Sequence, residues 1–152
     1  MKSNLFDRIM TGLSFLILLV TTVFVLLRWD SLPEQIPSHY NFKGQPDAYG
    51  GTGSLIFSMV MGWVMLLTMM IVSRFPHLWN TGVERTPANA AVVNRIVRDM
   101  ISVMELCLAT LFGYMIIVPV IGSEMCVWFM PAFLILIFGT IIVTAVRLIR
   151  NR

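Results

Sequence analysis

The stretch Ile9–Leu27 has the sequence IMTGLSFLILLVTTVFVLL and contains no charged side chain. Its length is close to the ~20 residues that a helix needs to cross the ~30 Å hydrocarbon core of a bilayer. Three similar apolar stretches follow it, at Leu55–Val72, Met100–Ile121 and Cys126–Val146. Because backbone groups that face lipid must find partners within their own segment, we expect each stretch to form a transmembrane helix.

The composition is typical of a chain that lies mostly in lipid. Of the 152 residues, 57% are hydrophobic and only 12% are charged, whereas soluble domains carry about 25% charged residues. The first stretch is longer than the ~7–15 apolar residues of a signal peptide, so we expect it to stay as an anchor. The sequence therefore predicts an all-α membrane protein, a single membrane domain over residues 1–152. The predicted helices cover residues 9–27, 55–73, 87–120 and 126–147, with a loop at 28–54.

The basic residues predict the orientation in the membrane. Only Arg28 and Lys43 fall on one side, and the other nine flank helix ends on the opposite side: Lys2, Arg8, Arg74, Arg85, Arg95, Arg98, Arg147, Arg150 and Arg152. Cytoplasmic segments are enriched in Lys and Arg, so we expect both termini in the cytoplasm and loop 28–54 outside. Beside membrane ends, these charges favour anionic lipid head groups as partners and do not indicate nucleic acid.

The third helix is expected to be longer than its membrane span. Thr86 followed by Pro87 is typical of an N-cap and a first helical residue, and helix can then continue to about Pro119. Its first three turns would stand in the cytoplasm or among the head groups. The short turn at Gly122–Glu124 predicts an antiparallel pair of third and fourth helices, and Pro131 predicts a kink in the fourth.

A polar stripe runs along one face of the third helix, formed by Asn94, Arg98, Ser102, Glu105, Ala109 and Gly113. Glu105 lies inside the apolar span, where an unpaired carboxylate is costly, so it should face the bundle and find a partner. Arg98, Arg147 and Arg74 are the candidate partners. Two interpretations stay open for Glu105. One is a proton or ion relay, and the other is a structural ion pair or a carboxyl group close to water at the inner leaflet.

Loop 28–54 is rich in Pro, Gly and apolar residues, and we expect it to be an ordered cap. Residues 38–42 are expected to be extended, and residues 43–46 to turn the chain back. His39, Asn41 and Asp47 are the polar side chains best placed to converge, where they would bind a metal, bind a peptide or tie the loop together. Since a zinc site needs three or four protein ligands and the loop offers two good ones, we predict no metal and no cofactor.

The same loop carries a motif, Leu32-Pro33-x-x-Ile36-Pro37-x-His39-x-Asn41-x-x-Gly44-x-x-Asp47-x-x-Gly50. It resembles the motif of the bacterial membrane family catalogued as domain of unknown function 1648, over about the first 70 residues. That family includes the N-terminal part of SdpI-type immunity proteins, which protect a cell from a secreted toxin and take part in membrane signalling. The resemblance implies a multi-pass protein of the bacterial cytoplasmic (inner) membrane and singles out Pro33, Pro37, His39, Asn41, Gly44, Asp47 and Gly50. Two departures are Thr52, where the family often has a basic residue, and a chain too short for the further C-terminal helices of SdpI-type proteins.

Three functions are compatible with these features. The first is a non-enzymatic immunity, sensing or accessory factor that binds a ligand or peptide at the outer loop. The second is a small homo-oligomeric transporter that uses Glu105. The third is a metal-dependent membrane hydrolase with His39 and Asp47 at the outer surface, for which the sequence offers no complete catalytic constellation. We therefore expect no enzyme activity.

Overall fold

The computed structural model describes residues 4–151, so Lys2 and Arg152, two of the basic residues behind the predicted orientation, lie outside the described residues. Four of its α-helices are long and apolar enough to cross a membrane, which confirms the predicted multi-pass class. The elements in chain order are α1 (Leu5–Arg28), η1 (Trp29–Ser31), β1 (Ile36–Tyr40), β2 (Pro46–Gly50), α2 (Gly53–Val72), η2 (Pro76–Leu78), α3 (Ala90–Ile121) and α4 (Phe129–Arg150).

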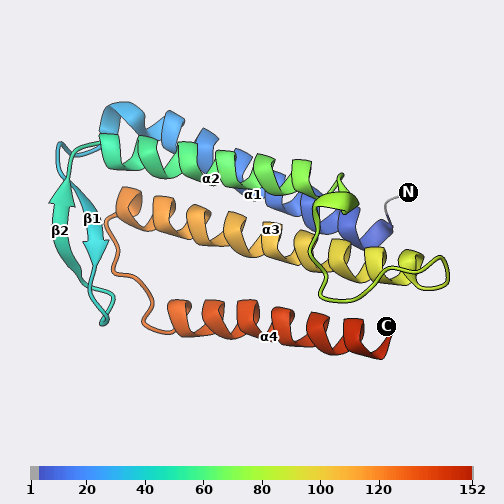
Figure 1. Cartoon of the computed structure of the whole chain (residues 1–152). Helices are drawn as coiled ribbons and strands as arrows, with labels where there is room; N and C mark the ends of the chain where they lie inside the picture. Colours follow the sequence, from blue (N-terminus) through green and yellow to red (C-terminus); the bar gives the residue numbers. More distant parts are fainter. Residues whose placement is uncertain (1–3, 152) are drawn as a thin grey trace.

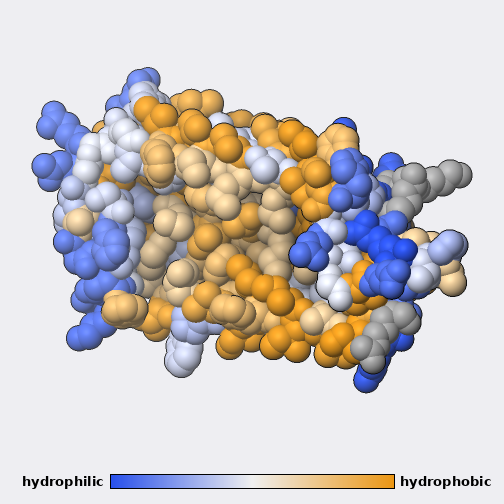
Figure 2. Space-filling view, in the orientation of Figure 1, coloured by the Kyte–Doolittle hydropathy of each residue, from blue (hydrophilic) through white to orange (hydrophobic). Residues whose placement is uncertain are grey.

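The helices run side by side, with the two-stranded hairpin across one end and both termini at the other (Figure 1). We call these the hairpin end and the terminal end. A broad apolar belt separates two hydrophilic ends, as expected of a chain that spans a bilayer (Figure 2). Arg28 and Lys43 lie at the hairpin end, and the other basic residues of the described chain lie at the terminal end. The side of the membrane that each end faces stays a prediction from this asymmetry.

Helix α3 is the centre of the bundle, since α1, α2 and α4 all pack against it. Three clusters of buried side chains follow its length. From the hairpin end to the terminal end they are Val25, Ile36, Leu55 and Ile116; then Leu18, Leu66 and Ala109; then Val93, Ile96, Val97, Ile101 and Leu148. Helix α4 contributes only Leu148 to these clusters and is the least buried of the four helices. The apolar surface that it leaves exposed is suited to lipid.

Glycines let α3 approach its neighbours closely. A Cβ atom at Gly113 would lie 3.1 Å from Ile17 Cγ2 and 3.2 Å from Thr21 Oγ1, both on α1. A Cβ atom at Gly62 of α2 would lie 3.1 Å from the side chain of Phe112. Since dispersion contacts drive much of helix association in a membrane, these close approaches stabilise the three-helix core.

The ends of α3 and α4 differ from the predicted ones. Helix α3 begins at Ala90 and not at residue 87, although Thr86 has the capping role that the sequence predicts. Asn89 N donates to Thr86 Oγ1 at 3.3 Å, and Thr86 N donates to Asn89 Oδ1 at 2.8 Å, which is the exchange of a capping box. The turn that these bonds close leads into the helix through the bond from Ala90 N to Thr86 O. Helix α4 begins at Phe129, three residues after the predicted start. Pro131 then falls in the first turn, where no backbone donor is needed, so the basis for the predicted kink is lost.

The first turns of α3 pack against other parts of the protein. Val93 and Ile96 are buried, and Trp79 from the α2–α3 connection packs against their cluster. Arg85 holds that connection in place by donating hydrogen bonds to the backbone carbonyls of Pro76 and Trp79. A folded lid of residues 73–89 therefore covers one face of the predicted cytoplasmic extension.

Candidate functional site

The hairpin is fastened to the helices at two points. Ile36 begins β1 and is fully buried in the cluster of α1, α2 and α3 residues at the hairpin end. The carbonyl oxygen of Gly44 in the turn accepts a hydrogen bond of 2.7 Å from the backbone N–H of Met125, between α3 and α4. Gly44 has a φ of +76°, and a Cβ atom there would overlap the Met125 carbonyl group. Only glycine fits this place without strain.

Asn41 closes the hairpin turn. Its side-chain oxygen accepts hydrogen bonds from the backbone N–H groups of Lys43 at 2.8 Å and Gln45 at 3.2 Å. Its backbone N–H donates to the Gln45 carbonyl at 2.9 Å. Asn41 therefore holds the turn and does not share a ligand site with His39. The sequence expectation of an extended piece followed by a turn is close, but the strand starts at Ile36 and a second strand, Pro46–Gly50, returns beside it.

His39 and Asp47 face each other across the two strands. His39 Nδ1 lies 2.5 Å from Asp47 Oδ1, and the two side chains are 70% and 43% exposed. The described residues contain no group of three His, Cys, Asp or Glu side chains suited to a metal ion. Two donors fall short of the three protein ligands of a catalytic zinc site. The pair is an exposed polar contact between the two strands.

A cavity of about 260 Å³ lies between the hairpin and the helix ends. Pro37, Ser38 and Tyr40 of β1 line it from one side, and residues of α2, α3 and α4 line it from the others. The Tyr40 hydroxyl group is buried and has no hydrogen-bond partner among the described residues. Burial raises the pKa of Tyr40 above its usual value, and the nearby Tyr49 and Tyr114 raise that pKa further, so its hydroxyl group keeps its proton.

The remaining motif residues are placed around this cap. Pro33 is exposed in the segment that leads into β1, and Gly50 ends β2 opposite Ile36. A Cβ atom at Gly50 would lie 3.5 Å from the Ser38 Cβ atom, which is an ordinary van der Waals distance. The motif thus describes a folded cap held over a cavity.

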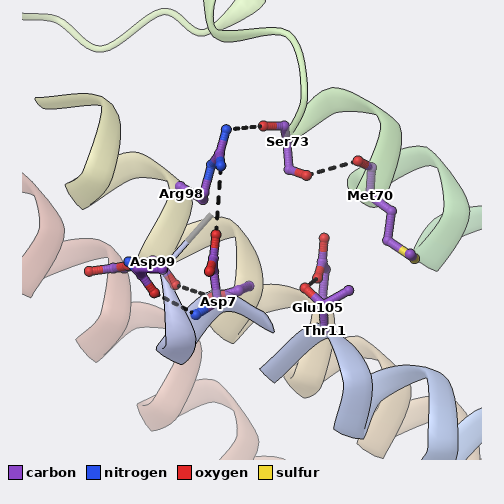
Figure 3. A network of polar contacts seen from close by, with 9 residues as sticks. Asp7, Thr11, Met70, Ser73, Arg98, Asp99 and Glu105 are labelled. Atoms are coloured by element: carbon purple, nitrogen blue, oxygen red, sulfur yellow. Dashed lines mark hydrogen bonds and ion pairs between the residues drawn. The ribbon is translucent and has the colours of Figure 1, made fainter. Parts of the chain in front are cut away.

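A second polar region lies at the terminal end, between α1 and α3 (Figure 3). Arg98 Nη1 lies 3.7 Å from Asp7 Oδ2, and both side chains are largely buried. Arg147 Nη2 lies 3.9 Å from Asp99 Oδ2, and Asn4 donates to the other oxygen of Asp99 at 2.8 Å. The charges of Asp7 and Arg98 are removed from water and need such a partner, so this pair fixes α1 against α3. The Arg147–Asp99 pair joins α4 to α3, with the Arg147 side chain half exposed.

Glu105 has a different partner from those predicted. It is 1% exposed, and Thr11 Oγ1 of α1 donates a hydrogen bond to its Oε2 atom at 2.5 Å (Figure 3). The expectation of an arginine partner is wrong, because Arg98 and Arg147 pair with Asp7 and Asp99 instead. Seven residues of helix separate Arg98 from Glu105 by about 10 Å along the axis, so the arginine finds an acid nearer the membrane surface.

A cavity of about 740 Å³ opens beside this cluster. Asp7 and Thr11 of α1, Ser73 and Arg74 after α2, and Arg98 of α3 are among its lining residues. Thr11 therefore contacts both the cavity and Glu105. Two other residues of the α3 polar stripe do not bond to Thr11 or Glu105. The Ser102 hydroxyl group donates to the Asp99 carbonyl of its own helix. The buried Asn94 side-chain oxygen has no hydrogen-bond partner in the described chain.

The polar residues that α1 contributes to the terminal-end cluster were not predicted from the sequence. Asp7, Thr11, Ser14 and Thr21 are spaced by four, three and seven residues, which places them on one helix face. This polar stripe would have identified the face that meets α3. The cavity under the hairpin has no comparable local pattern, because its lining comes from four separate elements.

The fold defines a multi-pass membrane protein with a hairpin cap. A family model described as a domain of unknown function (DUF1648) matches residues 16–62, which supports the resemblance drawn from the motif. The matched segment contains most of α1, the hairpin and the first half of α2, and is under half of the chain. No curated protein and no solved structure matches the chain. Residues 16–62 are thus the part of this chain that is similar to that family.

Proposed function

We propose that this protein is a non-enzymatic binding protein of the bacterial inner membrane, with an immunity, sensing or accessory function. Its hairpin end faces outward and receives an apolar side chain of an extracytoplasmic peptide. The observation that carries this proposal is the cavity of about 260 Å³ beneath a hairpin fastened at Ile36 and Gly44. Because the cap is already folded, binding does not have to order the loop.

The size and lining of the cavity favour a peptide side chain as the occupant. Sites for drug-sized molecules are about 300–1,000 Å³, so this cavity is smaller than that class. Met115, Met125 and Met130 line it, and methionine side chains adapt to apolar groups of different shapes. The unpartnered Tyr40 hydroxyl group supplies a hydrogen-bond donor for a peptide carbonyl beside the inserted side chain.

The rim has the polar and aromatic residues that peptide recognition uses. His39 lines the cavity and, with Asp47, presents exposed polar atoms at its edge. Phe42 at the hairpin turn is fully exposed, which leaves its ring free to contact a partner or the head-group region. An apolar anchor surrounded by polar contacts is the usual arrangement at a protein interface.

Growth inhibition tests this proposal. A strain that lacks the protein is compared with one that produces it, across a panel of cationic amphipathic peptides that act on the cell envelope. We expect the producing strain to withstand at least one peptide at a several-fold higher concentration. Ser38→Trp, which places a large ring in the cavity, should abolish that difference while the protein level in the membrane stays the same.

Ser123→Trp is the matched control, since Ser123 is exposed in the turn after α3 and does not line the cavity. It should protect as the wild type does. Equal sensitivity of both strains to every peptide would contradict the proposal. So would full protection by Ser38→Trp at a normal protein level.

A second candidate is a small homo-oligomeric transporter, favoured by the path from the terminal-end cavity through Thr11 to Glu105. Glu105 is buried without an ion-pair partner among the described residues, as expected of an acid that exchanges a proton. Proton flux in proteoliposomes, followed with a pH-sensitive dye, should fall at least tenfold in Glu105→Gln. Flux that is equal in the wild type and in Glu105→Gln would exclude this function.

A further inference from the structure

A groove of about 650 Å³ lies between α3 and α4, and the Asp99–Arg147 pair described above forms part of its lining at the terminal end. Phe6 of the first turn of α1 borders it at the terminal end. On α4 its lining includes Ile135, Gly139, Val143 and Arg147, at successive intervals of four residues. Such spacing places these residues in one row along the helix. The groove therefore runs lengthwise along the bundle.

The two ends of the groove differ in chemistry. Arg95, Asp99 and Arg147 lie at the terminal end, whereas the deeper part is lined by apolar residues such as Val103 and Ile135. From Ile135 to Arg147 the row is about 18 Å long at 1.5 Å per residue. Half of a ~30 Å hydrocarbon core is about 15 Å, so the groove has the length of one leaflet.

The charges at the terminal end favour an anion. Asp99 holds Arg147 at 3.9 Å and is itself held by the amide of Asn4, but the Arg147 side chain stays 50% exposed. Arg95 is exposed, and no ion pair with another described side chain engages it. Two arginines against one carboxylate leave a net charge of +1 at the terminal end of the groove.

We propose that this groove is a binding site for one anionic phospholipid of the leaflet at the terminal end. Arg95 and Arg147 contact the phosphate and the anionic head group, and one acyl chain lies between α3 and α4 beside Gly139. Basic pockets between transmembrane helices are suited to anionic head groups, and the apolar row below them is suited to hydrocarbon. The site is independent of the peptide function proposed for the hairpin end.

Gly139 provides a specific way to block the groove. It lines the groove, and a Cβ atom there would meet nothing within 4 Å. Gly139→Phe therefore fills the acyl part without disturbing the buried clusters of the bundle. Leu134→Phe is its matched control, because Leu134 is an exposed residue of the same helix that does not line the groove.

Native mass spectrometry of the full chain tests the proposal. The protein is delipidated in mild detergent and then exposed to an equimolar mixture of phosphatidylglycerol and phosphatidylethanolamine with identical acyl chains. We expect one phosphatidylglycerol to be retained in preference. Arg95→Gln and Arg147→Gln should each lower that preference about fivefold, whereas Arg150→Gln, outside the groove, should leave it unchanged.

Gly139→Phe should lose the bound lipid, and Leu134→Phe should keep it. Inorganic phosphate alone should not displace the lipid, since the acyl chain contributes to binding. Retention of both lipids equally, or retention unchanged in Arg95→Gln, Arg147→Gln and Gly139→Phe, would overturn the proposal. Displacement by inorganic phosphate would also overturn it and would identify a site for free phosphate instead.

Discussion

The two ends of this molecule use polar side chains in opposite ways. At the terminal end, Asp7 and Arg98 are buried and hold α1 against α3. At the hairpin end, His39 and Asp47 form a shorter contact, but both side chains are open to solvent. A buried pair is costly to break, whereas an exposed pair contributes little to stability. The terminal-end pair therefore supports the fold, and the hairpin-end pair is free to contact a partner.

The largest predicted effect comes from removing one buried charge. Asp7→Leu leaves the Arg98 guanidinium group without a carboxylate, which should destabilise the protein by about 3–5 kcal/mol. Thermal unfolding in detergent measures it. Glu84→Leu, an exposed acid at the same end, should change stability by less than about 0.5 kcal/mol.

The double variant Asp7→Leu/Arg98→Met tests whether the two buried charges stabilise the protein as a pair. Removing both charges leaves neither one buried alone, so the double variant should recover most of the stability that Asp7→Leu loses. If the double variant is as unstable as the sum of its two single variants, Asp7 and Arg98 are not coupled and the account of the terminal end is wrong.

A smaller effect is predicted where the hairpin meets the helices. Gly44→Ala introduces a side chain at a φ of +76° and against the Met125 carbonyl group, and should cost about 1–3 kcal/mol. Gly82→Ala separates the effect of a positive φ from that of the clash with Met125, since Gly82 has a φ of +64° but open space around it. Thermal unfolding should rank Gly44→Ala as the less stable of the two. The reverse order would mean that the Met125 contact does not hold the hairpin.

Asn41→Ala should have an effect of about 1 kcal/mol, because it removes the acceptor for two backbone N–H groups of an exposed turn that water can partly replace. Hydrogen exchange at Lys43 and Gln45 should become faster, while exchange in α3 should not change. Unchanged protection at both amides would show that the Asn41 side chain does not close the turn.

The smallest effect on stability is expected at the exposed pair. His39→Ala should shift the unfolding free energy by less than about 1 kcal/mol yet weaken the peptide protection proposed above. His77→Ala, an exposed histidine at the terminal end, should alter neither quantity. A large loss of stability in His39→Ala would mean that the pair supports the fold and would remove the contrast between the two ends.

The four helices could be predicted because length and hydropathy are properties of contiguous sequence, as in the stretch that begins at Ile9. Contacts between residues that are far apart in the sequence could not be predicted in this way. The hydrogen bond from Met125 N to the Gly44 carbonyl oxygen joins segments that no local sequence pattern connects. The cavity beneath the hairpin depends on this bond. The partner of Glu105 was missed because arginines were matched to it by charge, whereas depth in the membrane decides which acid each arginine meets.

The cavity beneath the hairpin is proposed to receive an apolar side chain of a peptide. Methyl NMR of methionine-labelled protein tests it directly, using the peptide from the growth panel against which the protein protects most. Met115, Met125 and Met130 line that cavity, whereas Met70 lines the terminal-end cavity. We expect the peptide to shift the methyl resonances of the three methionines in that cavity and to leave the Met70 resonance unchanged. A shift at Met70 alone, or no shift at the three cavity methionines, would contradict it.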